Sequence, residues 1–181
     1  MAVPGYQSLM LPLLQIASDG KTRQKNEYRE ELAAHLQLSD DDLAEMMPTS
    51  GRPVFTRRAS WAMGHLQRAG LLDRPRKGYY CISERGKKVL AEGPERIDNQ
   101  FLSRYDEFRV YWTRGSRKKE PMKATPDSDE ATPEETLEAA YQQLRGELVL
   151  EILEHVKSAS PLFFERLVVE LLVGMGYGGS M

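Results

Sequence analysis

The sequence predicts a mostly helical α+β protein with two folded parts joined by a linker. Apolar residues at helical spacing occur along most of the 181-residue chain, and one short β-hairpin is expected near its middle. Residues 115–136 are rich in Pro, Ser, Thr and charge and have almost no large apolar side chain, so this stretch cannot bury enough surface to fold alone. We therefore expect a domain over residues 1–114, a flexible linker over residues 115–136 and a helical part over residues 137–181.

The first domain is expected to open with two helices and a short third one. Pro12 lies inside the first apolar run and indicates either a kink or a helix start near Leu11. A second helix covers about residues 27–37. Ser39 then caps a short acidic helix, "DDDLAEMM", which stops before Pro48.

A longer helix and a hairpin follow. The helix is expected from about Thr56 to Ala69, with Gly70 as its C-cap. Its inward face is apolar and consists of Phe55, Ala59, Ala62, Leu66 and Ala69. The segments "LLDRP" and "YYCIS" are short strands joined by "RKG", in which Gly78 can supply a positive φ. Ser83 starts a further helix, which is broken at residues 93–94.

This order of helices and hairpin is that of a winged helix-turn-helix. The helix from Thr56 to Ala69 is then the recognition helix, and "RPRKG" is the tip of the wing. The aromatic segment "FLSRYDEFRVYW", residues 101–112, is expected to pack on this domain.

Two helices are expected after the linker. Thr132 and Glu135 frame a capping box for a long helix, "PEETLEAAYQQLRGELVLEILEHVKS". Ser160 caps the next helix, which has Pro161 at its first position and ends at Gly176. Both helices carry an apolar stripe, which favours self-association through them.

The charge distribution points to a nucleic-acid partner. The overall charge of −2 hides a split, because residues 1–119 carry net +6 and residues 120–181 carry net −8. Residues 52–88 alone contain ten Lys or Arg and only two acidic residues. We expect a double-stranded DNA partner, since a recognition helix can reach base edges and a basic wing can neutralise phosphates. The predicted DNA-binding residues are Arg57, Arg58, Ser60, Arg68, Arg74, Arg76 and Lys77.

Other classes of protein are disfavoured. The single cysteine and three widely spaced histidines do not form a zinc-ligand pattern. No apolar run is long enough to span a bilayer and the N-terminus lacks a basic secretory segment, so we expect a cytoplasmic protein without membrane partners.

The motifs resemble those of one family. The segments "LMLPLLQIASDGK", "RRASWAMGHLQRAGLLDRPRKGYYCISERGKKVL" and "SPLFFERLVVELLVGMGYGG" are similar, in this order, to Mrr-type restriction proteins. These are type IV, modification-dependent endonucleases that join a winged-helix domain to a nuclease domain of the PD-(D/E)xK class. The resemblance implies that residues 137–181 are the helical start of such a nuclease domain.

The resemblance also implies that this chain lacks the catalytic core. In the family an Asp in a "GxDG"-like segment and a "QxK"-like motif bind the metal, and both would follow Met181. Glu165 alone aligns with an acidic residue that can assist the metal site. We expect a chain that binds DNA, uses no cofactor of its own and does not cut, whereas a full-length relative cleaves foreign methylated DNA with Mg²⁺. The alternative is a winged-helix transcription regulator that dimerises through its C-terminal helices.

Overall fold

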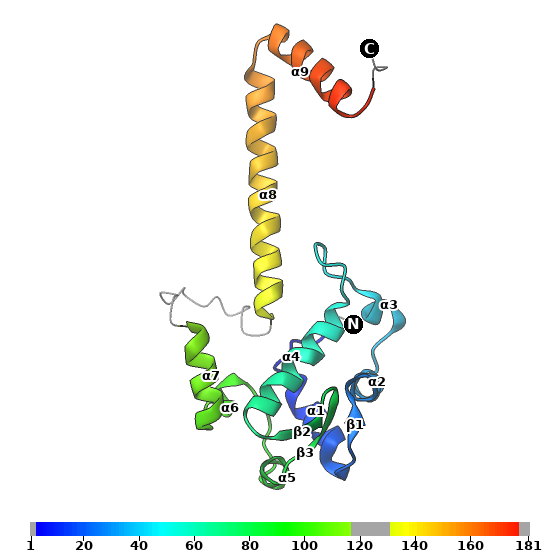
Figure 1. The fold of residues 1–181 in the computed structure, drawn as a ribbon, viewed down its shortest axis with the longest axis vertical. Coiled ribbons are helices and arrows are strands. Elements are labelled where there is room, and N and C mark those ends of the chain that lie inside the picture. The colour runs from blue at the N-terminus through cyan, green and yellow to red at the C-terminus, as the bar shows by residue number, and fades with distance from the viewer. Residues whose placement is uncertain (1–2, 117–130, 178–181) are drawn as a thin grey trace. The chain divides into compact units, whose positions relative to one another are not determined.

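The computed structural model describes residues 3–116 and 131–177 (Figure 1). The chain forms two compact units, Met1–Glu138 and Ala139–Met181. None of the helices in the described ranges is both long enough and apolar enough to cross a membrane.

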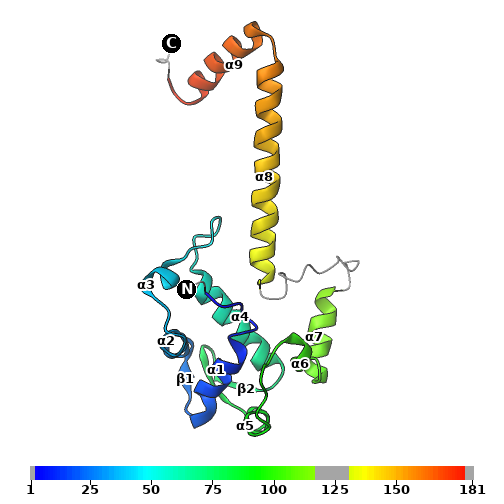
Figure 2. The same ribbon diagram turned by 180° about the vertical axis from the view of Figure 1, so that it is seen from behind.

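Three helices form the core of the first unit. α1 (Met10–Ile16) contacts both α2 (Lys25–His35) and α4 (Val54–Arg68), and the two ribbon views place it between them (Figures 1 and 2). The short 3₁₀ turn Ala17–Asp19 follows α1 and ends at Gly20, whose φ is 73°. The core between these helices is apolar and includes the fully buried Leu9, Leu13, Leu14, Leu32, Met63 and Leu66.

A three-stranded antiparallel sheet lies beside the helices. Its strands are β1 (Arg23–Gln24), β2 (Leu72–Arg76) and β3 (Tyr79–Ile82), in the order β1-β3-β2. The pairing of β2 with β3 shifts register between Asp73 and Arg76, where the sequence has a proline. A proline is tolerated there because β2 is an edge strand. The expected hairpin is confirmed, with Gly78 at φ 84° in its turn, whereas β1 was not predicted.

α4 has the expected inward face. Phe55, Ala59, Ala62, Leu66 and Ala69 are all buried. Gly70 follows the helix with a φ of 70°, as its predicted capping role requires.

The acidic helix after Ser39 is shorter than predicted. α3 covers Asp40–Ala44, with Ser39 as its N-cap, and Glu45 has left the helical conformation. The chain then becomes extended because Met46 forms a β-bridge with Pro53. The backbone N–H of Met47 also donates to the carbonyl of Arg52 at 2.9 Å, so these residues close a loop before α4 instead of prolonging α3.

The aromatic segment packs on this unit as expected. α5 (Glu84–Ala91) contacts β3, and the segment itself forms α6 (Asn99–Leu102) and α7 (Asp106–Ser116), both of which contact α4. Leu102 and Phe108 are completely buried against the core.

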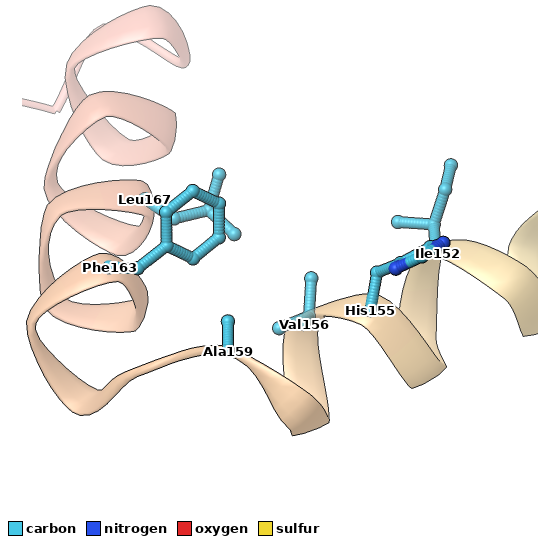
Figure 3. A pocket seen from close by; sticks show the side chains of 6 residues that line it. All are labelled: Ile152, His155, Val156, Ala159, Phe163 and Leu167. Carbon is cyan, nitrogen blue, oxygen red and sulfur yellow. The ribbon is translucent and has the colours of Figure 1, made fainter.

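Two further helices follow residue 130. α8 (Pro133–Ser158) begins in the first unit and continues into the second, and α9 (Pro161–Gly174) follows it. The predicted N-cap is present, since the Ser160 hydroxyl accepts from the Phe163 N–H at 3.3 Å. At the corner between α8 and α9, six side chains line an open hollow (Figure 3). They are Ile152, His155, Val156, Ala159, Phe163 and Leu167.

The predicted linker range needs correction at both margins. Residues 115–116 are the last residues of α7, and residues 133–136 are the first turn of α8. The capping box at Thr132 and the aromatic packing of α7 account for these extensions of helix. Residues 117–130, the remainder of the predicted linker, lie outside the described residues.

Candidate nucleic-acid interface

The two arginines at the start of α4 are both engaged in the structure. Arg57 forms an ion pair with Glu134. The guanidinium of Arg58 donates to Glu135 Oε1 through Nε at 2.8 Å and also donates to the carbonyl of Val3. Both arginine side chains keep about a fifth of their surface exposed, so each lies at the surface while bound to a carboxylate.

Ser60 is held by its neighbours. Its hydroxyl donates to the Thr56 carbonyl at 2.6 Å and accepts from Arg29 Nη2 at 2.8 Å. Ser60 therefore serves as an anchor for Arg29, a residue of α2 that was not among the predicted DNA contacts. The amide oxygen of Asn26 accepts from the same guanidinium at 2.8 Å.

The predicted wing residues lie on and around the hairpin. The Arg76 guanidinium stacks on the Tyr79 ring at 3.4 Å from its centroid, while the Tyr79 hydroxyl accepts from the side chain of Gln24 at 2.6 Å. Arg74 lies 5.9 Å from the centroid of the Tyr80 ring. Lys77 is exposed in the turn. The aromatic rings of β3 thus orient the two arginines of β2.

Arg68 lies away from the other predicted residues of α4. It is eleven residues beyond Arg57, which corresponds to about 16 Å along a helix axis. Its guanidinium stacks on Tyr111 of α7, 4.0 Å from the ring centroid. The structure therefore does not bring Arg68 together with the N-terminal arginines of α4.

Four cations from three elements interact electrostatically near the N-terminus of α2. Burial is the main reason that the pKa of Lys25 is lowered, and the nearby charges of Arg29, Arg57 and Arg74 lower it further. We call these four residues the cation cluster. They come from α2, α4 and β2, although Lys25 and Arg74 are far apart in the sequence.

Two members of the cation cluster, Arg57 and Arg29, differ in how they are compensated, because Arg57 forms an ion pair with Glu134 whereas Arg29 is held by the neutral side chains of Ser60 and Asn26. Burial also lowers the pKa of Arg29, and its Nε is buried without a hydrogen-bond partner among the described residues. Like charges brought together at partial burial repel one another, and this repulsion is relieved when an anion binds. Phosphate groups of a nucleic acid satisfy this requirement, since guanidinium and ammonium groups both bind phosphate oxygens.

The described residues do not suit a catalytic metal. Within the described ranges, no group of three or more His, Cys, Asp or Glu is placed to hold a metal ion. Glu165, the acidic residue that the family resemblance suggested, is exposed on α9. A divalent magnesium site needs several fixed oxygen ligands, so we assign no reaction step to these residues.

Comparison with known proteins finds a similarity in the first unit. Residues 6–92 match the Mrr N-terminal domain. The chain is also 30% identical over 187 residues to the type IV methyl-directed restriction enzyme EcoKMrr of Escherichia coli (strain K12). That alignment covers 99% of this chain but only 61% of the relative's length. No solved structure matches the chain.

Proposed function

We propose that the first unit is a winged helix-turn-helix domain that binds double-stranded DNA. Its helices are followed by a hairpin, and its sheet has the order β1-β3-β2. In this arrangement α4 enters the major groove and the β2–β3 hairpin lies along the DNA backbone as the wing.

The observation that carries this proposal is the cation cluster. Arg29 of α2 donates to Ser60 of α4 at 2.8 Å, and the Lys25 backbone N–H donates to the Gly78 carbonyl in the hairpin turn at 2.9 Å. The charges of Arg29, Arg57 and Arg74 act on Lys25 within this arrangement. We assign Lys25, Arg57 and Arg74 to phosphate contacts, together with Arg76 and Lys77 of the wing. Arg29 holds Ser60 and adds positive charge beside them. Arg58 and Arg68 stay predicted DNA contacts, and Arg58 must release Val3 or Glu135 to make one.

The name of the similar restriction enzyme suggests which kind of DNA this chain recognises. Its name describes a methyl-directed restriction enzyme, and we propose that this chain likewise recognises methylated foreign DNA. The first unit then supplies the recognition step.

The wing is tested through the salt dependence of binding. Each neutralised phosphate contributes about −0.9 to the slope of log K against log salt, so Arg76→Ala/Lys77→Ala should flatten that slope by about 2. Fluorescence anisotropy with a labelled duplex, methylated and unmethylated, measures it. Arg104→Ala/Arg109→Ala removes the same charge near α6 and α7 and should leave the slope unchanged. Equal slopes for the wing variant and the wild type would place the phosphate contacts elsewhere.

Lys25 provides a separate test of the cation cluster. Lys25→Ala should reduce the magnitude of the salt slope by about 1, because one phosphate contact is lost. Lys21→Ala is the matched control, since Lys21 lies four residues away and its side chain is 75% exposed beside Asp19. If both variants weaken binding equally, the effect of Lys25 reflects general charge and not a defined contact.

A further inference from the structure

The first turn of α8 lies against the N-terminal part of α4. Glu134 pairs with Arg57, Glu135 pairs with Arg58, and Glu138 accepts a hydrogen bond from the Thr49 hydroxyl. These residues belong to the first compact unit, which ends at Glu138. Thr132, which precedes this turn, is completely buried, so the segment is packed onto the unit and not merely close to it.

A capping box holds the two carboxylates in place. Glu135 Oε2 accepts from the Thr132 backbone N–H at 2.7 Å, and the Thr132 hydroxyl accepts from the Glu135 N–H at 3.3 Å. The other carboxylate oxygen of Glu135 is thereby directed to Arg58. Only 15% of the Glu135 side chain is exposed. Acidic groups in the first turn of a helix are also stabilised by its dipole, so this geometry persists without DNA.

We propose that residues 132–138, the acidic cap, compete with DNA for the arginines of α4, an inference that rests on the DNA-binding function proposed above. Carboxylate and phosphate oxygens accept from the same guanidinium N–H groups, and a donor occupied by one cannot serve the other. DNA therefore has to displace the acidic cap from α4. When DNA binds α4, release of the cap would change the start of α8, the helix that leads out of the first unit.

Arg57 is expected to respond most strongly to this release. It forms an ion pair with Glu134, and it also belongs to the cation cluster. Arg58 keeps its bond to the Val3 carbonyl when Glu135 leaves, so it remains partly restrained. The acidic cap thus masks one of the cations that the proposed DNA contact needs.

The test neutralises the two carboxylates without removing the helix cap. A glutamine at the third helical position can still complete a capping box, so Glu134→Gln/Glu135→Gln should keep the fold. Duplex DNA binding, measured by fluorescence anisotropy, should tighten by roughly 3- to 30-fold, the range expected when two partly exposed ion pairs no longer compete. Glu147→Gln/Glu151→Gln removes the same charge further along α8 and corrects for the general loss of negative charge.

A second measurement follows the cap itself. Hydrogen exchange in a peptide spanning residues 132–138 should rise when saturating DNA is added to the wild-type chain, while exchange in the first turns of α4 falls. An affinity gain no larger than that of the Glu147/Glu151 control, or unchanged exchange in the cap, overturns the proposal. If DNA binds but the cap variant behaves like the control, only this inference fails. If neither wild type nor variant binds DNA, the proposed function fails with it, and binding gained by the variant alone supports both.

Discussion

His65 of α4 is buried against α6, α7 and Tyr6, which precedes α1. Its ring makes edge contacts with Tyr6, Trp61, Phe108, Tyr111 and Trp112. Nδ1 lies 3.0 Å from Asn99 Oδ1, and the buried Nε2 has no hydrogen-bond partner among the described residues. The neutral imidazole suits this apolar setting, because a buried charge without a partner is costly. His65 therefore acts as a packing residue of the domain.

Stability should fall in mild acid because of this histidine. Burial lowers the pKa of His65 from 6.5 to about 4, the bond to Asn99 opposes this shift and the charge of Arg68 adds to it. Between these two pH values the unfolded chain binds a proton that the folded chain excludes, so stability decreases as pH falls from 6.5 towards 4. The loss between pH 7 and pH 5 should be on the order of 2 kcal/mol. Urea unfolding at both pH values measures it, and His65→Gln should flatten the dependence. An equal pH dependence in the variant would assign the effect to other groups.

The basic residues of the candidate interface could be found in the sequence only in part. The run from Arg52 to Lys88 is visible as a local excess of charge. Lys25 and Arg29 were missed because they lie outside the basic run from Arg52 to Lys88, and they join the cluster only through the packing of α2. Their spacing of four, which places both on one face of a helix, was the available signal. The partners of Arg57 and Arg58 lie 77 residues away, beyond the reach of any local pattern.

At the scale of elements, the long helices and the β2–β3 hairpin were predictable, whereas the two-residue strand β1 was not. The apolar face of α4 repeats over four turns, so its type and position followed from spacing. β1 has two residues and no periodicity, and it exists because Arg23 and Gln24 pair with Tyr80 and Tyr79 of β3. The end of α3 also depended on a contact between separate loop residues, the bridge of Met46 to Pro53.

The packing of α5 against the hairpin depends on one glycine. Gly86 is buried, and a Cβ at this position would lie 2.3 Å from the Leu71 carbonyl oxygen and 2.8 Å from Ile82 Cγ1. The N–H of Gly86 also donates to the Ser83 hydroxyl at 3.0 Å, and that hydroxyl reaches the Gly70 carbonyl. The start of α5 is therefore fixed against backbone that cannot move freely.

Gly86→Ala should destabilise the first unit. Overpacking of a well-packed site typically costs about 1–3 kcal/mol, and here the obstructing atom is backbone, so we expect the upper part of that range. Lys88→Ala, at an exposed position of the same helix, is the control and should change stability by less than about 0.5 kcal/mol. Thermal and urea unfolding give both values. A Gly86→Ala protein as stable as the wild type would mean that α5 can shift away from Leu71 at little cost.

At the scale of the whole molecule, the two units differ in how much of their apolar side-chain surface is exposed. The first unit buries them in one contiguous core. No residue of α8 or α9 is buried, and large apolar side chains of both helices are exposed. Those with at least 60% exposure include Leu144, Leu150, Leu162, Val169, Leu171 and Val173. The apolar stripes were visible in the sequence, but a stripe does not identify the surface that covers it.

This exposed surface should make the 181-residue chain self-associate. Contiguous apolar patches are seldom left in water, and association removes them from solvent at roughly 25 cal/mol for each Å² buried. Sedimentation velocity should show an average mass that rises with protein concentration. Leu150→Glu/Leu171→Glu, which places charge on both helices, should shift the chain towards the monomer. Glu147→Gln/Arg166→Gln changes polar groups on the same two helices and should leave association intact. A wild-type chain that stays monomeric as its concentration is raised would mean that α8 and α9 cover their apolar side chains within one molecule, in an arrangement different from the open corner of Figure 3.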